Sequence, residues 1–137
     1  MRGLTFCAVA TIMLAVAVPA SACMPTSIQF GLGSARLDAE SRSAIDDAVN
    51  EFRARRGARF QLTAQTDGIG SASANMRLAR RRGQAVKAAL IRRGIPASAI
   101  DVIAEGEGRR RGAAPENRLV WLVVVDAREQ ASQGCSG

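Results

Sequence analysis

The alternation of apolar and polar residues predicts four strands and two helices. Strand-like runs alternate with period two or are continuously apolar, whereas the helical runs repeat an apolar position every third or fourth residue. The predicted strands are Ser27 to Gly31, "RFQLTAQT" from Arg59 to Thr66, "AIDVIAEG" from Ala99 to Gly106, and "RLVWLVVVD" from Arg118 to Asp126. One predicted helix has its N-cap at Asp38 and runs to about Arg56, and the other runs from about Ala72 to Arg93.

This order, β-α-β-α-β-β, predicts an α/β (α+β) two-layer sandwich. Two right-handed crossovers would place both helices on one face of a four-stranded mixed sheet. The run from Arg118 to Asp126 is the most apolar and β-branched part of the chain after residue 22. We therefore expect it to be a central strand buried on both faces, running antiparallel to the strand before it.

The first residues have the pattern of an export signal. A positive start at Arg2 precedes an apolar run from Phe6 to Val18, and small residues at Ala20 and Ala22 give an A-x-A cleavage pattern. We expect residues 1–22 to be removed, residues 23–126 to form the domain, and residues 127–137 to be a flexible tail. A short hydrophobic anchor is the alternative for residues 1–22. The domain itself is expected to contain no transmembrane span.

Export places the remaining cysteines, Cys23 and Cys135, in an oxidising compartment, where an even pair favours a disulfide. The segment "ASAC" also resembles a weak lipobox, in which Cys23 would carry lipid and Cys135 would stay unpaired. The expected location is the periplasm. An outer-membrane lipoprotein held through Cys23 is the alternative.

Composition narrows the chemistry. The chain has a formal net charge of +7, and almost all of its cations are arginines, which suit carboxylate or phosphate partners. It has no histidine, the commonest general base and metal ligand, so we expect no enzyme activity, no metal and no cofactor. The positive charge would also suit a nucleic-acid-binding protein, but the export signal and the low aromatic content of 4% argue against that function.

One arginine of the second helix does not fit a solvated face. Arg80 and Arg81 lie off the predicted inward stripe, whereas Arg82 lies on it. The stripe consists of Asn75, Leu78, Arg82, Val86 and Ala89. A buried guanidinium without acceptors would cost several kcal/mol, on the order of what is lost when a buried ion pair is broken, so Arg82 needs a partner.

Asp67, in the turn before this helix, is the nearest candidate partner. The structural interpretation is an Asp67–Arg82 ion pair that pins the turn to the helix, or an Arg82 that reaches the rim and binds nothing. The functional interpretation is a shallow pocket, in which Arg82 binds a ligand carboxylate and Asp67 a ligand ammonium. Gly68 and Gly70 would let such a ligand approach backbone N–H groups near the helix start.

The same segments resemble the OmpA-like domain, found in outer membrane protein A and in peptidoglycan-associated lipoprotein. The resemblance runs from about Ser27 to Val125, and it rests on T-D-x-x-G-S, then N-x-x-L, then an arginine, at the family spacing. It implies the fold above and non-covalent binding of peptidoglycan, through the diaminopimelate of the stem peptide. An outer-membrane partner is a further implied contact, and the resemblance implies a periplasmic protein associated with peptidoglycan or the outer membrane.

Carried onto this chain, the residues that hold diaminopimelate in the family are Asp67 and Arg82. Asn75 matches the asparagine that organises the turn and the helix start, and Thr66 precedes the aspartate. The chain departs from the family pattern at several positions, among them Gln65, Ala74 and Leu119. A degenerate domain that serves as a protein-interaction module in the envelope is therefore the alternative function.

Overall fold

The computed structural model describes residues 25–107 and 115–126. Its helices and strands follow in the order β1 (Thr26–Gln29), α1 (Ala39–Ala54), β2 (Arg59–Thr66), α2 (Ala72–Arg92), β3 (Ile100–Glu107) and β4 (Leu119–Val125), with short 3-10 turns at Ala97–Ala99 and Pro115–Asn117. The predicted order is confirmed, and the helix ends differ from the predicted ones by one or two residues. The expected signal at 1–22, both cysteines of the expected disulfide and the expected tail at 127–137 lie outside the described residues.

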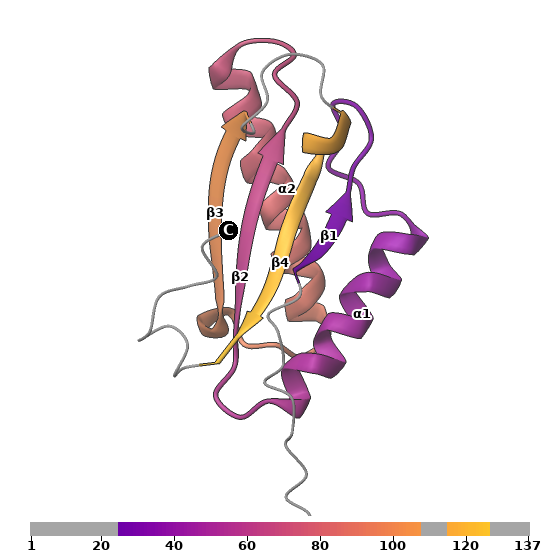
Figure 1. The fold of residues 1–137 in the computed structure, drawn as a ribbon, viewed down its shortest axis with the longest axis vertical. Helices are drawn as coiled ribbons and strands as arrows, with labels where there is room; N and C mark the ends of the chain where they lie inside the picture. The colour runs from indigo at the N-terminus through magenta and orange to yellow at the C-terminus, as the bar shows by residue number, and fades with distance from the viewer. Residues whose placement is uncertain (1–24, 108–114, 127–137) are drawn as a thin grey trace, which may run out of the picture.

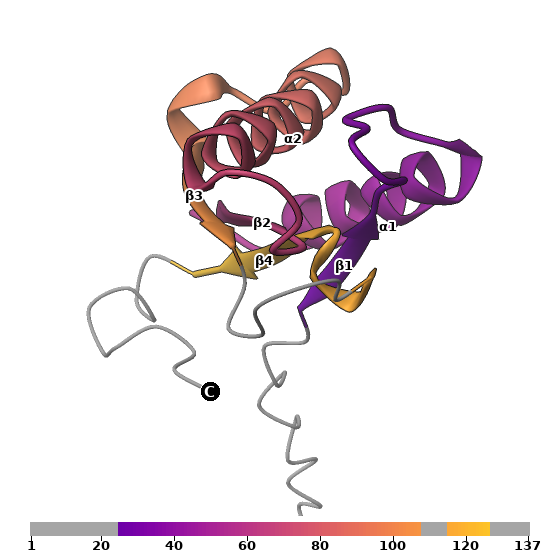
Figure 2. The same ribbon diagram turned by 90° about the horizontal axis from the view of Figure 1, so that it is seen from above.

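The four strands form one mixed sheet with both helices on the same face (Figures 1 and 2). Its order is β1-β4-β2-β3, in which β2 and β3 are parallel and β4 is antiparallel to both β1 and β2. The α/β two-layer architecture and the central position of β4 are therefore confirmed. β4 follows β3 in the chain but does not pair with it, because it inserts between β1 and β2 instead.

The core lies between the helices and one face of the sheet. Alternate residues of β2 face α2 and are fully buried, whereas the residues between them are exposed or half-buried. β4 is less uniformly buried than its composition predicts, because Trp121 and Val123 lie half-exposed on the other face. No helix in the two described ranges is both long and apolar enough to cross a bilayer.

Local signals explain where the helices begin and end. The Asp38 side chain accepts a hydrogen bond from the Ser41 N–H at the start of α1, and the Ser71 side chain accepts one from the Ala74 N–H at the start of α2. Gly94 ends α2 with φ at +87°, a left-handed conformation that favours glycine. These caps fix the position of α2 along the sheet and so set which of its residues face the core.

Candidate functional site

The inward stripe predicted for α2 is confirmed. Asn75, Leu78, Arg82, Val86 and Ala89 are all buried, whereas Arg80 and Arg81 are exposed. Arg82 is 0% exposed and is the largest of the fully buried side chains in the described chain. The arginine that does not fit a solvated face is therefore an interior residue.

The guanidinium of Arg82 is held by three backbone carbonyl groups. Its Nε donates to the Ser34 oxygen at 2.9 Å, its Nη1 to the Gln65 oxygen at 3.0 Å and its Nη2 to the Gly31 oxygen at 3.0 Å. The charge also lies over the Phe30 ring, 5.2 Å from its centroid. Arg82 thus connects α2 to the end of β2 and to the loop between β1 and α1.

Electrostatics around Arg82 follow from this position. Burial lowers the pKa of its guanidinium, the nearby Asp67 carboxylate raises it, and Arg118 and Arg81 lower it further. An arginine with three hydrogen bonds stays charged, so it carries a fixed positive charge inside the domain. That charge makes the surrounding interior favourable for a carboxylate.

Asp67 is paired with a different arginine. Its Oδ2 accepts a hydrogen bond from Nε of Arg118 at 2.6 Å, and the Asp67 side chain is 3% exposed, against 21% for Arg118. The structural interpretation of the sequence expected an Asp67–Arg82 ion pair, whereas the described residues place Arg118 in that role. Arg82 acts on Asp67 through proximity of charge, and Arg118 acts through direct contact.

Arg118 is the residue of the site that sequence reasoning did not single out. Ala64 of β2 lies opposite Val120 of β4 in the antiparallel register, so Arg118, two residues before Val120, falls beside the end of β2. Asp67 is the residue that follows β2. A signal existed in the sequence, because the polar pair Asn117-Arg118 directly precedes the strand with the strongest apolar run. That signal places Arg118 beside Asp67 only once the pairing of β4 with β2 is known.

Thr66 and Asn75 lie in the same region, as the sequence predicts. Nδ2 of Asn75 donates to Oε1 of Glu107 at 3.3 Å, which ties the first turn of α2 to the end of β3. Thr66 is 0% exposed, and its Oγ1 has no hydrogen-bond partner among the described residues. A buried hydroxyl without a partner costs free energy, which sets Thr66 apart from the apolar residues of β2 that are buried beside it.

A β-bulge shapes this end of the sheet. The β2–β3 register runs Ala64 to Ala104 and then Gln65 to Gly106, so one residue of β3 is left over. Gly106 has φ at +71° and packs against Met76 of α2, where a Cβ would come within 3.4 Å of the methionine methyl. The bulge therefore lies where the ends of β2 and β3 meet the first turns of α2, the region of Thr66, Asp67 and Asn75.

The family model for the OmpA family matches residues 29–119. The chain belongs to the OmpA family. That span includes every residue of the site just described, from the carbonyl of Gly31 to Arg118. The family resemblance seen in the sequence motifs is therefore confirmed.

Individual relatives agree with this assignment. The chain is 28% identical over 107 residues to the outer-membrane lipoprotein YfiB of Pseudomonas aeruginosa, covering 74% of this chain and 64% of that protein. The peptidoglycan-associated lipoprotein of Burkholderia pseudomallei superposes with a TM-score of 0.65 at 19% identity, covering 73% of this chain and 90% of the other. The C-terminal domain of Helicobacter pylori MotB superposes with a TM-score of 0.63 at 16% identity, over 77% and 89%. At these identities the two solved structures establish the fold of this OmpA-family domain.

Proposed function

We propose that this OmpA-family domain is a non-catalytic module that binds peptidoglycan in the bacterial envelope. We further propose that Asp67 and Arg82 recognise the diaminopimelate of the stem peptide, and that Thr66 and Asn75 shape the site. Support comes from the family, from the peptidoglycan-associated relative, and from the charges gathered at the start of α2. The observation that carries the proposal is a nearly buried carboxylate, Asp67, between two arginines.

The chemistry of diaminopimelate suits this arrangement. The end of its side chain carries an ammonium and a carboxylate on one carbon atom, so a binding site needs one anion and one cation a few ångströms apart. Asp67 supplies the anion at the N-terminal end of α2, where backbone N–H groups also favour a ligand carboxylate. Charge-assisted hydrogen bonds of this kind contribute roughly 1.5–3 kcal/mol each, so one domain binds modestly and a polymeric wall adds avidity.

Arg118 sets a condition on ligand entry. It occupies Oδ2 of Asp67, so a ligand ammonium must either join this pair or displace the guanidinium. A displaced Arg118, one-fifth exposed, is free to bind the ligand carboxylate with its planar fork. We therefore include Arg118 in the proposed site as the group that exchanges Asp67 for the ligand.

Arg82 has a more restricted part in this proposal. Three of its five N–H hydrogens are directed to the carbonyls of Gly31, Ser34 and Gln65. Because the side chain is 0% exposed, a ligand carboxylate reaches the remaining hydrogens only after a neighbouring group moves. Without such a movement, Arg82 contributes its positive charge to the site and holds the loop between β1 and α1 in place.

We also propose an envelope location for the whole protein. The outer-membrane lipoprotein among the relatives, together with the leader-like residues 1–22, supports a periplasmic domain near the wall. The chain spans 64% of that relative's length, so membrane attachment through Cys23 and contact with an outer-membrane partner are part of the proposal.

A sedimentation assay with purified peptidoglycan tests the function. We expect wild type and Arg81→Ala to sediment with diaminopimelate-type peptidoglycan, and Asp67→Asn to remain in solution. Lysine-type peptidoglycan, which lacks the terminal carboxylate, is the matched control for general attraction to a basic protein. Free diaminopimelate should release the bound protein.

Arg82 requires a conservative substitution in this assay, because replacing its side chain with alanine removes three hydrogen bonds to the backbone. Arg82→Lys keeps the charge, and its folding is checked by circular dichroism before binding is measured. Equal sedimentation of wild type and Asp67→Asn would refute recognition through the site. A folded wild type that binds neither wall type would instead favour the degenerate interaction module, whose motivation is the departures at Gln65, Ala74 and Leu119.

A further inference from the structure

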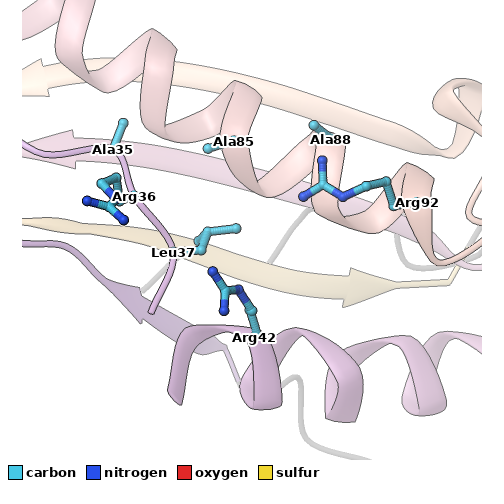
Figure 3. A pocket seen from close by; sticks show the side chains of 7 residues that line it. All are labelled: Ala35, Arg36, Leu37, Arg42, Ala85, Ala88 and Arg92. Carbon is cyan, nitrogen blue, oxygen red and sulfur yellow. The ribbon is translucent and has the colours of Figure 1, made fainter. Parts of the chain in front are cut away.

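A second concave site lies on the helical layer, away from Asp67. It is a hollow of about 300 Å³ bounded by α1, by the second half of α2 and by the loop that joins β1 to α1 (Figure 3). Its lining residues are Ala35, Arg36, Leu37, Arg42, Ala85, Ala88 and Arg92. Three of these are arginines and none is acidic, so we call it the three-arginine groove.

The three arginines reach the groove from three separate parts of the fold. Arg36 comes from the loop, Arg42 from the first turns of α1 and Arg92 from the last turn of α2, and all three surround Leu37 (Figure 3). By contrast Arg77, Arg80 and Arg81 line a second hollow, of about 430 Å³, whose lining residues all belong to α2, with Ala74 as the fourth. Convergence from three elements distinguishes the three-arginine groove from this hollow on a single helix.

The guanidiniums of the groove are not engaged in hydrogen bonds or ion pairs with the described residues. All three arginines are exposed, and across residues 25–107 and 115–126 none of their guanidiniums has a hydrogen bond or a carboxylate within 4.0 Å. Asp38 is already engaged as the N-cap of α1, and its pKa is lowered mainly by the Ser41 N–H and only slightly by Arg42. Three like charges around one hollow repel one another, and an anion placed between them removes that repulsion.

We propose that the three-arginine groove binds the phosphate of an anionic phospholipid headgroup. Guanidinium forks match phosphate oxygens in geometry and charge, and three of them can engage one phosphate from three sides. Leu37 and the three alanines give the rest of the groove a small apolar wall that suits the glycerol part of a headgroup. It contains no aromatic ring on which a nucleobase could stack, which disfavours nucleic acid as the occupant.

Two further observations favour a membrane surface over a soluble phosphate. Leu32 is 64% exposed and Ile91 is 43% exposed, and they belong to the same loop and helix that supply Arg36 and Arg92. Exposed apolar side chains on the same elements as a group of cations are a feature of surfaces that rest on a bilayer interface. In addition, α2 carries six basic residues and no acidic one, so its field attracts the domain to an anionic surface.

This binding does not depend on the proposed peptidoglycan site. Asp67 precedes the start of α2, whereas Ala88 lies 16 residues beyond Ala72, or about 24 Å along the helix axis at 1.5 Å per residue. Both sites can therefore be occupied at once. Asp67 is the residue that separates them in a test, because Arg82 also holds the loop carbonyls of Gly31 and Ser34, next to Arg36.

Vesicle flotation tests the proposal, with the exported protein produced without lipid on Cys23. We expect it to float with vesicles that contain phosphatidylcholine and phosphatidylglycerol in equal amounts, and not with phosphatidylcholine alone. The combined substitutions Arg36→Gln, Arg42→Gln and Arg92→Gln should weaken the interaction by at least roughly tenfold. The matched control combines Arg56→Gln, Arg77→Gln and Arg80→Gln, which removes the same charge from exposed positions outside the groove.

A control variant that keeps its affinity to within about threefold, beside the loss in the groove variant, would support the proposal. Equal losses in both variants would mean general attraction by net charge and would overturn it, as would a wild type that does not float. A groove variant that floats normally but no longer binds a single-stranded DNA oligonucleotide would overturn the proposal and show that the groove binds nucleic acid, not lipid. Inorganic phosphate added as competitor separates free phosphate from headgroup binding, because release at low millimolar concentration would assign the groove to the free ion.

Discussion

Nε of Arg118 donates to Oδ2 of Asp67 at 2.6 Å, which joins the start of β4 to the residue that follows β2. The Asp67 carboxylate is nearly buried and has lost most of its hydration. The Arg118 guanidinium and the positive charge of Arg82 compensate for that loss. The pair therefore sets both the stability of this corner of the sheet and the state that any ligand meets.

A double-mutant cycle at this pair should reveal strong coupling. Arg118→Ala leaves the Asp67 carboxylate buried without its partner, so we expect the free energy of unfolding to fall by about 3 kcal/mol. Adding Asp67→Asn should recover part of that loss, because the uncompensated charge is then gone. Urea denaturation measures all four proteins, and strictly additive effects would contradict the coupling.

Arg82 should be among the most costly positions of the domain to truncate. Arg82→Ala removes the donor groups that three backbone carbonyls use. Each carbonyl left unpaired costs roughly 1–3 kcal/mol, so we expect the free energy of unfolding to fall by at least about 3 kcal/mol. The matched control is Arg81→Ala on the exposed face of the same helix, with a change within about 0.5 kcal/mol. Thermal and urea denaturation would measure both, and a similar effect for the two variants would refute the interior role of Arg82.

The N-cap of α1 should make stability dependent on pH. The pKa of Asp38 lies below its ordinary value of 3.8, chiefly because its carboxylate accepts a hydrogen bond from the Ser41 backbone N–H. A carboxyl with a lowered folded-state pKa stabilises the protein above its ordinary pKa, and this contribution is lost as pH falls through the lowered value.

Asp38→Asn separates the cap from the charge, because asparagine caps helices well but does not titrate in this range. We expect wild type to be more stable than Asp38→Ala at neutral pH, with the melting-temperature difference shrinking as the pH is lowered below about 4. Asp38→Asn should show no such change with pH. A difference between wild type and Asp38→Ala that stays constant with pH would contradict the assignment.

Gly83 in the middle of α2 should resist replacement by alanine. Alanine favours helix by about 1 kcal/mol over glycine, but a Cβ here would come within 2.6 Å of Cγ1 of Val102 on β3. Valine is stiff at χ1 and cannot swing aside easily, so we expect Gly83→Ala to lower stability despite the gain in propensity.

Combining Gly83→Ala with Val102→Ala tests the cause. The clash is then absent, so the double variant should be more stable than the sum of the two single effects, by about 1 kcal/mol or more. Additive effects would mean that α2 shifts to accommodate the methyl group without involving Val102.

The sequence predicts the fold well because its signals are local. Caps at Asp38, the apolar stripe of α2 and the alternation in β2 each act within one element, and the burial of Arg82 follows from periodicity alone. The pairing of β4 is different, because no local pattern says that it inserts between β1 and β2. Arg118 was missed for that reason, since its contact with Asp67 exists only through this pairing.

The partners of Arg82 were also beyond a local argument. A buried guanidinium needs acceptors, and a carboxylate is the obvious choice when only side chains are considered. The structure uses the backbone of Gly31, Ser34 and Gln65 instead, which are carbonyls that every residue possesses and no sequence pattern marks.

The three hydrogen bonds of Arg82 also bear on the order in which the chain can become structured. The Arg82 side chain, about fifty residues further along the chain, donates hydrogen bonds to the carbonyls of Gly31 and Ser34 and so fixes this loop. During synthesis this loop emerges early, yet it cannot settle until α2 has formed and packed on the sheet. A fragment that ends before α2 would thus contain β1, α1 and β2 but lack the native shape of the loop between the first two.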